Sequence, residues 1–190
     1  MPIGFFSTKI MYKDYPNRKL NRMRGYDYSQ NGFYFVTICL KNKIEYFGSI
    51  KNGQMIINKF GKIVEYCWYD LINHYGNCRL DEFIIMPNHV HGIVEINNNR
   101  EGAGLKPART DLESARTLIN KKYSLSEMIR GFKSFSSRRI NEVNFDSVFR
   151  WQRSFYDHII QNDGSLYRIR KYIKNNPLRW ELDRNNNNEN

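Results

Sequence analysis

The chain has 190 residues, of which 41% are hydrophobic, and this is enough to build the core of one domain with short tails. Its 30 lysines and arginines outnumber its 19 acidic residues, and the net charge of +11 favours a polyanionic partner, with nucleic acid ahead of an anionic membrane surface. Three scattered cysteines exclude a disulfide framework, and no apolar run reaches the roughly 20 residues that span a bilayer, so we expect a cytoplasmic protein without membrane segments.

The N-terminal part predicts a basic arm followed by β-structure and a helix. Residues 1–30 are polar and basic, which indicates a loosely held arm. Residues 33–40 are β-branched and aromatic, as in a strand, and residues 47–58 predict a hairpin around the Asn52-Gly53 turn. Apolar residues between positions 60 and 71 follow helical spacing. The arm's candidates for contacts with a phosphate backbone are Arg18, Arg22 and Arg24.

Two strands and a long helix follow. Residues 80–86 and 89–96 predict strands joined at Pro87-Asn88. Residues 97–122 show no clean periodicity and contain glycine and proline, which indicates an exposed insertion. A capping box formed by Ser124 and Glu127 predicts the start of a helix. Three cations off the apolar face of that helix are further candidates for phosphate contacts: Lys133, Arg138 and Arg139.

The C-terminal part completes the pattern. Residues 155–161 predict a short strand, and residues 163–165 begin a last helix that cannot run through Pro177. Residues 183–190 are rich in asparagine and predict a disordered tail. The order β, β-hairpin, α, β, β, α, β, α predicts an α+β fold, an antiparallel sheet with helices packed mainly on one face.

Two histidines lie two residues apart in one of the expected strands. Because side chains alternate along a strand, His89 and His91 face the same side while Val90 faces the other. Two neutral imidazoles on one face can bind a divalent metal, and a metal can activate a phosphate. A His-x-His pair also occurs as a surface or packed pair, so its meaning depends on the rest of the chain.

The last helix contains a phenol and an amide four residues apart. Tyr172 and Asn176 are therefore neighbours on its surface, so that the phenol could attack a phosphorus atom while the amide oxygen binds the metal. The alternative is a tyrosine at the edge of the core and an asparagine that only ends the helix before Pro177. Tyr156 is a rival nucleophile because it lies close to His158, but it lacks the amide partner.

Four motifs in a fixed order resemble a known family. Together they resemble the single-tyrosine HUH transposases, most closely the REP-associated tyrosine transposases, over about residues 18–182 with a gap at 97–122. The resemblance implies a ferredoxin-like HUH endonuclease fold for residues 31–182. The motifs are GYDYSQNGFYFVT at 25–37, DEFIIMPNHVHG at 81–92, WQRSFYDH at 151–158 and YIKNNP at 172–177.

The resemblance implies a chemistry for these residues. The family cuts and rejoins single-stranded DNA near small hairpins, so Tyr172 would be the nucleophile that forms a 5′-phosphotyrosine. His89, His91 and Asn176 would bind the metal, and two imidazoles and an amide, which bring no charge, suit Mg²⁺ or Mn²⁺. Candidates for supporting the site or contacting DNA are Trp151, Gln152 and His158.

The same resemblance implies the partners. They would be single-stranded DNA with hairpin or inverted-repeat structure, bound by a monomer or a homodimer that is found with the nucleoid when it binds DNA. Two other functions stay open. One is a non-catalytic nucleic-acid-binding protein on a decayed transposase scaffold, which would form no covalent adduct. The other is a metallohydrolase that uses water, which would turn over without Tyr172.

Overall fold

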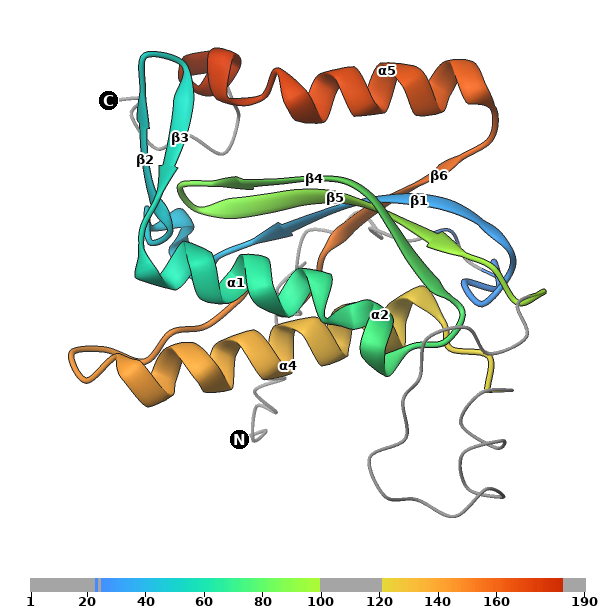
Figure 1. Ribbon diagram of the computed structural model, residues 1–190, viewed down its shortest axis with the longest axis horizontal. Coiled ribbons are helices and arrows are strands. Elements are labelled where there is room, and N and C mark those ends of the chain that lie inside the picture. The colour runs from blue at the N-terminus through green and yellow to red at the C-terminus, as the bar shows by residue number, and fades with distance from the viewer. Residues whose placement is uncertain (1–22, 24, 100–120, 183–190) are drawn as a thin grey trace, which may run out of the picture.

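The computed structural model describes residues 23, 25–99 and 121–182. Within these ranges the chain forms three layers, with an antiparallel sheet in the middle (Figure 1). The strand order is β4–β5–β1–β6, so β5 and β1 are central. The strands are β1 (Gly32–Cys39), β4 (Cys78–Met86), β5 (His89–Ile96) and β6 (Tyr156–Ile160).

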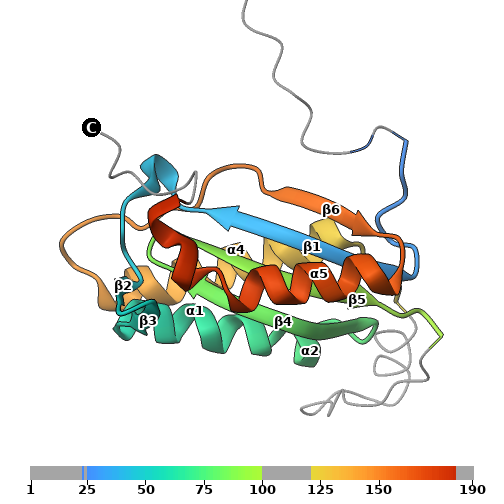
Figure 2. The same cartoon turned by 90° about the horizontal axis from the view of Figure 1, so that it is seen from above.

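The helices divide between the two faces of the sheet. Three of them cover one face, while the last helix, followed by a short 3₁₀ helix, lies over the other face, as Figure 2 shows from above. This confirms the α+β fold with an antiparallel sheet and helices mainly on one face. The first three are α1 (Lys59–Tyr69), α2 (Leu71–His74) and α4 (Leu125–Val143), and the last is α5 (Asp163–Lys174).

The expected hairpin forms a separate two-stranded sheet from β2 (Gly48–Lys51) and β3 (Gln54–Ile57). Both turn residues have positive φ, 51° at Asn52 and 69° at Gly53, which is why an Asn-Gly pair suits a two-residue hairpin loop. The turn packs against the 3₁₀ helix η2 (Pro177–Leu182), which follows α5.

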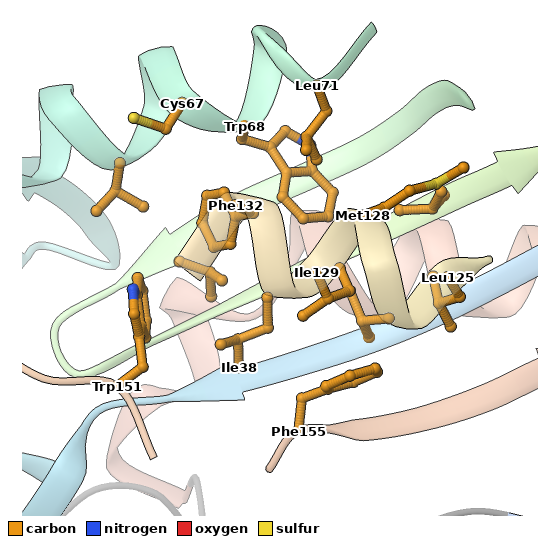
Figure 3. Close-up of a cluster of buried hydrophobic side chains, with 14 of the residues drawn as sticks. Ile38, Cys67, Trp68, Leu71, Leu125, Met128, Ile129, Phe132, Trp151 and Phe155 are labelled. Atoms are coloured by element: carbon orange, nitrogen blue, oxygen red, sulfur yellow. The ribbon is translucent and has the colours of Figure 1, made fainter. Parts of the chain in front are cut away.

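The larger core lies between the sheet and the layer of α1, α2 and α4. The Ser124 capping box begins α4 as the sequence predicts, with the Glu127 carboxylate 2.9 Å from the Ser124 backbone nitrogen. The apolar face of α4 is buried against β1 and against Trp68 of α1 (Figure 3). Side chains of this face that are fully buried are Leu125, Met128, Ile129 and Phe132.

One glycine of β5 fixes how Trp68 packs. Side chains alternate along β5, so Gly92 faces the larger core, and a Cβ atom there would collide with the indole ring of Trp68. The ring stacks on Phe83, whose centroid lies 4.6 Å away in the neighbouring strand β4. A larger residue at this position would push α1 away from the strand that carries the histidines.

Two sequence expectations about the chain as a whole can be compared with the fold. No helix in the described ranges is both long and apolar enough to cross a membrane. All three cysteines are buried free thiols, in agreement with the expected lack of a disulfide framework. Three expected segments lie wholly or mostly outside the described residues. They are the arm at 1–30, of which the structure describes only residue 23 and residues 25–30, the insertion at 97–122, and the tail at 183–190.

We expect Gly92→Ala to destabilise the protein by about 1–3 kcal/mol, because overpacking a filled core forces neighbouring side chains to shift. Urea unfolding followed by circular dichroism measures this change. The matched control is Gly164→Ala in the first turn of α5, where a new Cβ atom would make only ordinary contacts. That substitution should leave stability unchanged or raise it by about 0.5 kcal/mol. Equal effects of the two substitutions would contradict the packing role of Gly92.

Candidate active site

The two histidines lie side by side on the face of β5 that α5 covers. His89 is fully buried and His91 is 2% exposed. Their Nε2 atoms are 3.0 Å apart. Two imidazole nitrogens at this distance share a proton or a cation, because two lone pairs that face each other repel. The alternation predicted from the sequence therefore brings the two rings together.

A buried asparagine sets the tautomer of His89. The Nδ2 atom of Asn88 donates to the carbonyl oxygen of Lys43 at 2.9 Å, so the Oδ1 atom of Asn88 is the group that faces His89. The Nδ1 atom of His89 lies 2.9 Å from this oxygen and must donate to it. In the neutral ring the lone pair is then on Nε2, which points at His91.

His91 is oriented by two residues of β1. The Thr37 hydroxyl lies 2.8 Å from Nδ1 of His91, and the two residues are paired across the strands. The ring of Phe35 stacks on the imidazole with the centroids 5.3 Å apart. Thr37 and Phe35 thus hold the outer edge and one face of the ring, and Nε2 is directed toward His89 and α5.

The phenol of Tyr172 reaches the same place from α5. Its hydroxyl lies 3.4 Å from Nε2 of His91, and its ring packs edge-on against Phe35. Its side of the site is open to solvent, because Tyr172 is 41% exposed while the imidazoles are buried. The structure therefore places the expected nucleophile next to the expected metal ligands, although 81 residues separate Tyr172 and His91.

Asn176 differs from the expectation in one respect. The helix ends at Lys174 with Asn175 as its C-cap, so Asn176 lies in the turn that follows and not on the helix. A residue before proline disfavours helical backbone, which accounts for the earlier end. Asn176 is 2% exposed, and its Oδ1 atom is buried without a hydrogen-bond partner among the described residues.

The turn that carries Asn176 is held at both ends by residues that contact the histidines. Tyr172 precedes it and contacts His91, and Trp180 of η2 follows it and stacks on His89 with ring centroids 6.0 Å apart. Trp180 is 6% exposed and covers the His89 side of the pair. The Asn176 amide therefore lies in a segment that spans the two imidazoles.

These side chains fit a divalent cation. An ion with octahedral geometry holds neighbouring ligands about 3.0 Å apart when each bond is about 2.1 Å, which matches the spacing of the two Nε2 atoms. The oxygen of Asn176, buried without a partner in the turn between Tyr172 and Trp180, would be the candidate for a third ligand. In the described part of the chain, no three His, Cys, Asp or Glu side chains gather into a metal-binding group, so a site here needs the amide.

Two ion pairs attach α5 to β4 on either side of the nucleophile. Arg170 donates two hydrogen bonds to the carboxylate of Asp81, with Nε 2.9 Å from Oδ1. One turn later Lys174 pairs with Glu82 at 2.7 Å. The hydrogen bonds from Arg170 lower the pKa of Asp81. The two cations flank Tyr172 in sequence, so these pairs help to fix where the phenol lies.

The rival tyrosine lies farther from the pair. Tyr156 is the β6 partner of Thr37, on the same face of the sheet as His91 but two strands away, about 10 Å at ordinary strand spacing. His158 pairs with Phe35 in the same way and is an exposed residue of the edge strand. The hydroxyl of Tyr172, by contrast, lies 3.4 Å from Nε2 of His91.

The third motif builds the larger core and its border. Trp151 is 8% exposed and its indole donates to the Ser136 hydroxyl at 3.0 Å, so the ring packs in the core and offers no surface for stacking on a base. Gln152 is half-buried at the edge of a surface depression. Lys133 donates to the carbonyls of residues 152, 153 and 154, and this lysine therefore organises the loop.

The remaining cations are not near the histidines. Arg138 and Arg139 lie on α4, on the opposite side of the sheet from Tyr172. The guanidinium of Arg139 lies over the ring of Tyr66, and that of Arg138 lies over the ring of Phe135. The expected contacts from the arm, Arg18, Arg22 and Arg24, lie outside the described residues.

Sequence reasoning missed the residues that orient the imidazoles. Asn88 and Thr37 lie within the motifs at 81–92 and 25–37, but no role was assigned to either residue. Trp180 lies after the proline that was expected to end the last helix, where no further element was predicted. Only the position of Asn88 directly before the pair was a signal that could have indicated its role.

Comparisons with known proteins relate the chain to a family. A family described as "Transposase IS200 like" matches residues 117–176, which include Tyr172 and Asn176. A Haemophilus influenzae protein of uncharacterised function is 40% identical over 172 residues, covering 88% of this chain and 92% of the relative. The chain belongs to the IS200-like transposase family. The segment that matches the family ends at Asn176, in the turn after α5.

Two more distant likenesses are to REP-associated tyrosine transposases. A second Haemophilus influenzae protein, assigned to the REP-associated tyrosine transposases, is 23% identical over 153 residues, covering 80% of this chain and 74% of the relative. A solved REP-associated tyrosine transposase bound to a REP hairpin aligns with a TM-score of 0.52 at 16% identity, covering 86% of this chain and 76% of that chain. This structural alignment shows that the chain has the same fold as the solved transposase.

We expect Asp81→Asn to lower the free energy of unfolding by about 1 kcal/mol at pH 7, because it removes one partner of a partly buried ion pair. The lowered pKa of Asp81 means that the pair stabilises the protein above pH 4 and that this contribution is lost as the pH falls through the lowered value. Urea unfolding at a series of pH values should therefore show the full difference between wild type and variant at pH 7 and a difference that shrinks as the pH falls through the lowered pKa.

The control for this prediction is Glu142→Gln, which removes an exposed pair with Arg138 whose atoms are 3.9 Å apart. Surface pairs of this kind contribute little, so the free energy of unfolding should stay within about 0.5 kcal/mol of wild type. A loss as large as that of Asp81→Asn would show that general charge, and not the attachment of α5, is being measured.

Proposed function

We propose that the protein is a single-strand DNA endonuclease and strand transferase that acts near DNA hairpins through a 5′-phosphotyrosine on Tyr172. The observation that carries this proposal is the 3.4 Å contact between the Tyr172 hydroxyl and Nε2 of His91, beside the paired Nε2 of His89. Membership of the IS200-like transposases and the fold shared with a hairpin-bound relative support it.

The proposed reaction exchanges one phosphodiester for another. The phenol oxygen of Tyr172 forms a bond to phosphorus and loses its proton, while the bond from phosphorus to the 3′ oxygen breaks and that oxygen takes up a proton. The energy of the ester is kept in the phosphotyrosine. A second DNA 3′-hydroxyl can then attack the same phosphorus and release the tyrosine, which makes the overall reaction strand transfer and not hydrolysis.

The chain supplies positioning for this reaction. His89, His91 and Asn176 would hold the cation, with Asn88 and Thr37 keeping the imidazole lone pairs directed at it. Bound Mg²⁺ or Mn²⁺ would withdraw charge from a nonbridging phosphate oxygen and so ease attack by a phenol. The net charge of +11 would hold the DNA through its phosphates, with binding that weakens as salt is added.

We expect Tyr172→Phe to abolish the covalent protein–DNA adduct and strand cleavage while DNA binding stays within about twofold of wild type, because only the attacking oxygen is removed. The assay uses single-stranded oligonucleotides that span hairpin-forming repeats flanking the gene, with adducts resolved on a denaturing gel. Tyr156→Phe is the matched control and should form the adduct normally. An adduct in Tyr172→Phe would overturn the assignment of the nucleophile.

The same assay separates the alternatives. DNA binding by the wild-type protein without any adduct would identify a binding protein on a decayed scaffold. Cleavage that continues in Tyr172→Phe and releases a free 5′-phosphate would identify a hydrolase that uses water.

We expect His89→Ala and His91→Ala each to reduce cleavage by at least about 100-fold, because each would remove one of three ligands of the cation. EDTA should abolish cleavage by the wild-type protein, and added Mg²⁺ or Mn²⁺ should restore it. His158→Ala, on the same face of the sheet but outside the pair, should cleave at the wild-type rate. Cleavage that persists in EDTA and in both histidine variants would refute the role of a metal.

A further inference from the structure

A surface groove lies at the end of the sheet where β4 turns into β5. It runs along both sides of the segment 147–153, which leads from α4 back to the sheet. On one side, a depression of about 450 Å³ lies between this segment and the second half of α4. On the other, a recess of about 360 Å³ lies between the segment and residues 40–46. We call the two together the 147–153 groove.

Unpaired cations line the 147–153 groove. Arg150, Arg153 and Lys41 are exposed, and none of their side chains has a hydrogen bond or an ion pair within the described part of the chain. None of the residues that line either side is acidic. Asp146 is the acid on the neighbouring loop, where its charge helps to raise the pKa of Tyr46 after the larger effect of burial. The groove is therefore complementary to a polyanion.

Exposed apolar side chains form the rim of the groove. Phe145 is 92% exposed and Val148 is 68% exposed, at a loop that the side chain of Asn144 ties down by donating to the Ser147 carbonyl and the Tyr46 hydroxyl. Val148 lines both sides of the groove and Phe145 lies three residues before it, and an exposed aromatic ring beside a cationic groove can stack on unpaired bases. Double-stranded DNA keeps its base faces covered, so this feature favours a single strand.

Hydrogen bonds connect the groove to the histidines. The backbone nitrogen of Lys41 donates to the carbonyl of Arg150 at 3.1 Å, so the two walls are joined. The carbonyl of Lys43, in the same short segment as Lys41, accepts from Asn88, and Asn88 orients His89. A strand in the groove would therefore lie against the segment that supports the metal ligands.

We propose that the 147–153 groove binds an unpaired stretch of the DNA strand, with phosphates on Arg150, Arg153 and Lys41 and a base stacked on Phe145. This inference rests on the proposed function in one respect, which is that the bound strand is the substrate of the proposed reaction. The groove itself is defined by charge, an exposed ring and backbone bonds that involve neither Tyr172 nor the metal ligands, apart from the Asn88 link.

The test is fluorescence anisotropy with labelled single-stranded dT20 at several salt concentrations. Removing two phosphate contacts lowers the slope of log affinity against log salt by about 1.4, at about 0.7 per contact for single strands. The double variant Arg150→Gln/Arg153→Gln should show this decrease. The matched control is Lys121→Gln/Lys122→Gln, two exposed cations before α4 at the other end of that helix, which should keep the wild-type slope.

The stacking part is tested separately. Phe145→Ala should weaken dT20 binding about fivefold or more and leave binding to a 20-base-pair duplex unchanged. Asp146→Asn should tighten dT20 binding, because it removes the negative charge beside the groove. Melting curves of each variant confirm that it folds. Equal losses in the arginine and lysine pairs, or an unchanged affinity in Phe145→Ala, would overturn the proposal.

These outcomes are independent of catalysis. If the wild-type protein forms no adduct but the groove variants lose dT20 binding, the proposed reaction fails and the groove stands. If the adduct forms normally and the groove variants bind dT20 like wild type, the groove proposal fails and the reaction stands.

Discussion

The alternation of side chains along β5 is the constraint on which the site depends. His89 and His91 face α5, while Val90 and Gly92 face the layer of α1 and α4. The indole of Trp68 packs directly against Gly92, where there is no room for a side chain. This contact fixes the position of β5 relative to α1. The direction of the imidazoles follows from that fit. The larger core therefore determines where the two imidazoles on the other face point.

The two faces of the sheet are held very differently. The face toward α1 and α4 packs a large set of aromatic and aliphatic side chains, whereas the buried apolar cluster under α5 is small. The ion pairs of Arg170 and Lys174 supplement it. The layer that carries Tyr172 thus rests on the smaller apolar cluster together with these ion pairs.

Local physics made much of the fold predictable. The Asn52-Gly53 turn, the capping box at Ser124 and the alternation at His89 and His91 each depend on a few neighbouring residues, and the structure has all three. The face of the sheet that α5 covers was not predictable. The apolar stripe of α5 fits either face, and the ion pair that selects one joins Arg170 to a carboxylate 89 residues away.

The site was predictable as a set of residues more than as a geometry. The spacing of Tyr172 and Asn176 suggested neighbours on one helix, but the chain leaves the helix at Lys174, and no local pattern indicated that Trp180 returns to cover His89. This departure matters for the chemistry. A buried amide oxygen without a partner costs about 1–3 kcal/mol, and a turn is free to aim that oxygen where a helix surface is not. A cation beside the imidazoles that took this oxygen as a ligand would offset the cost.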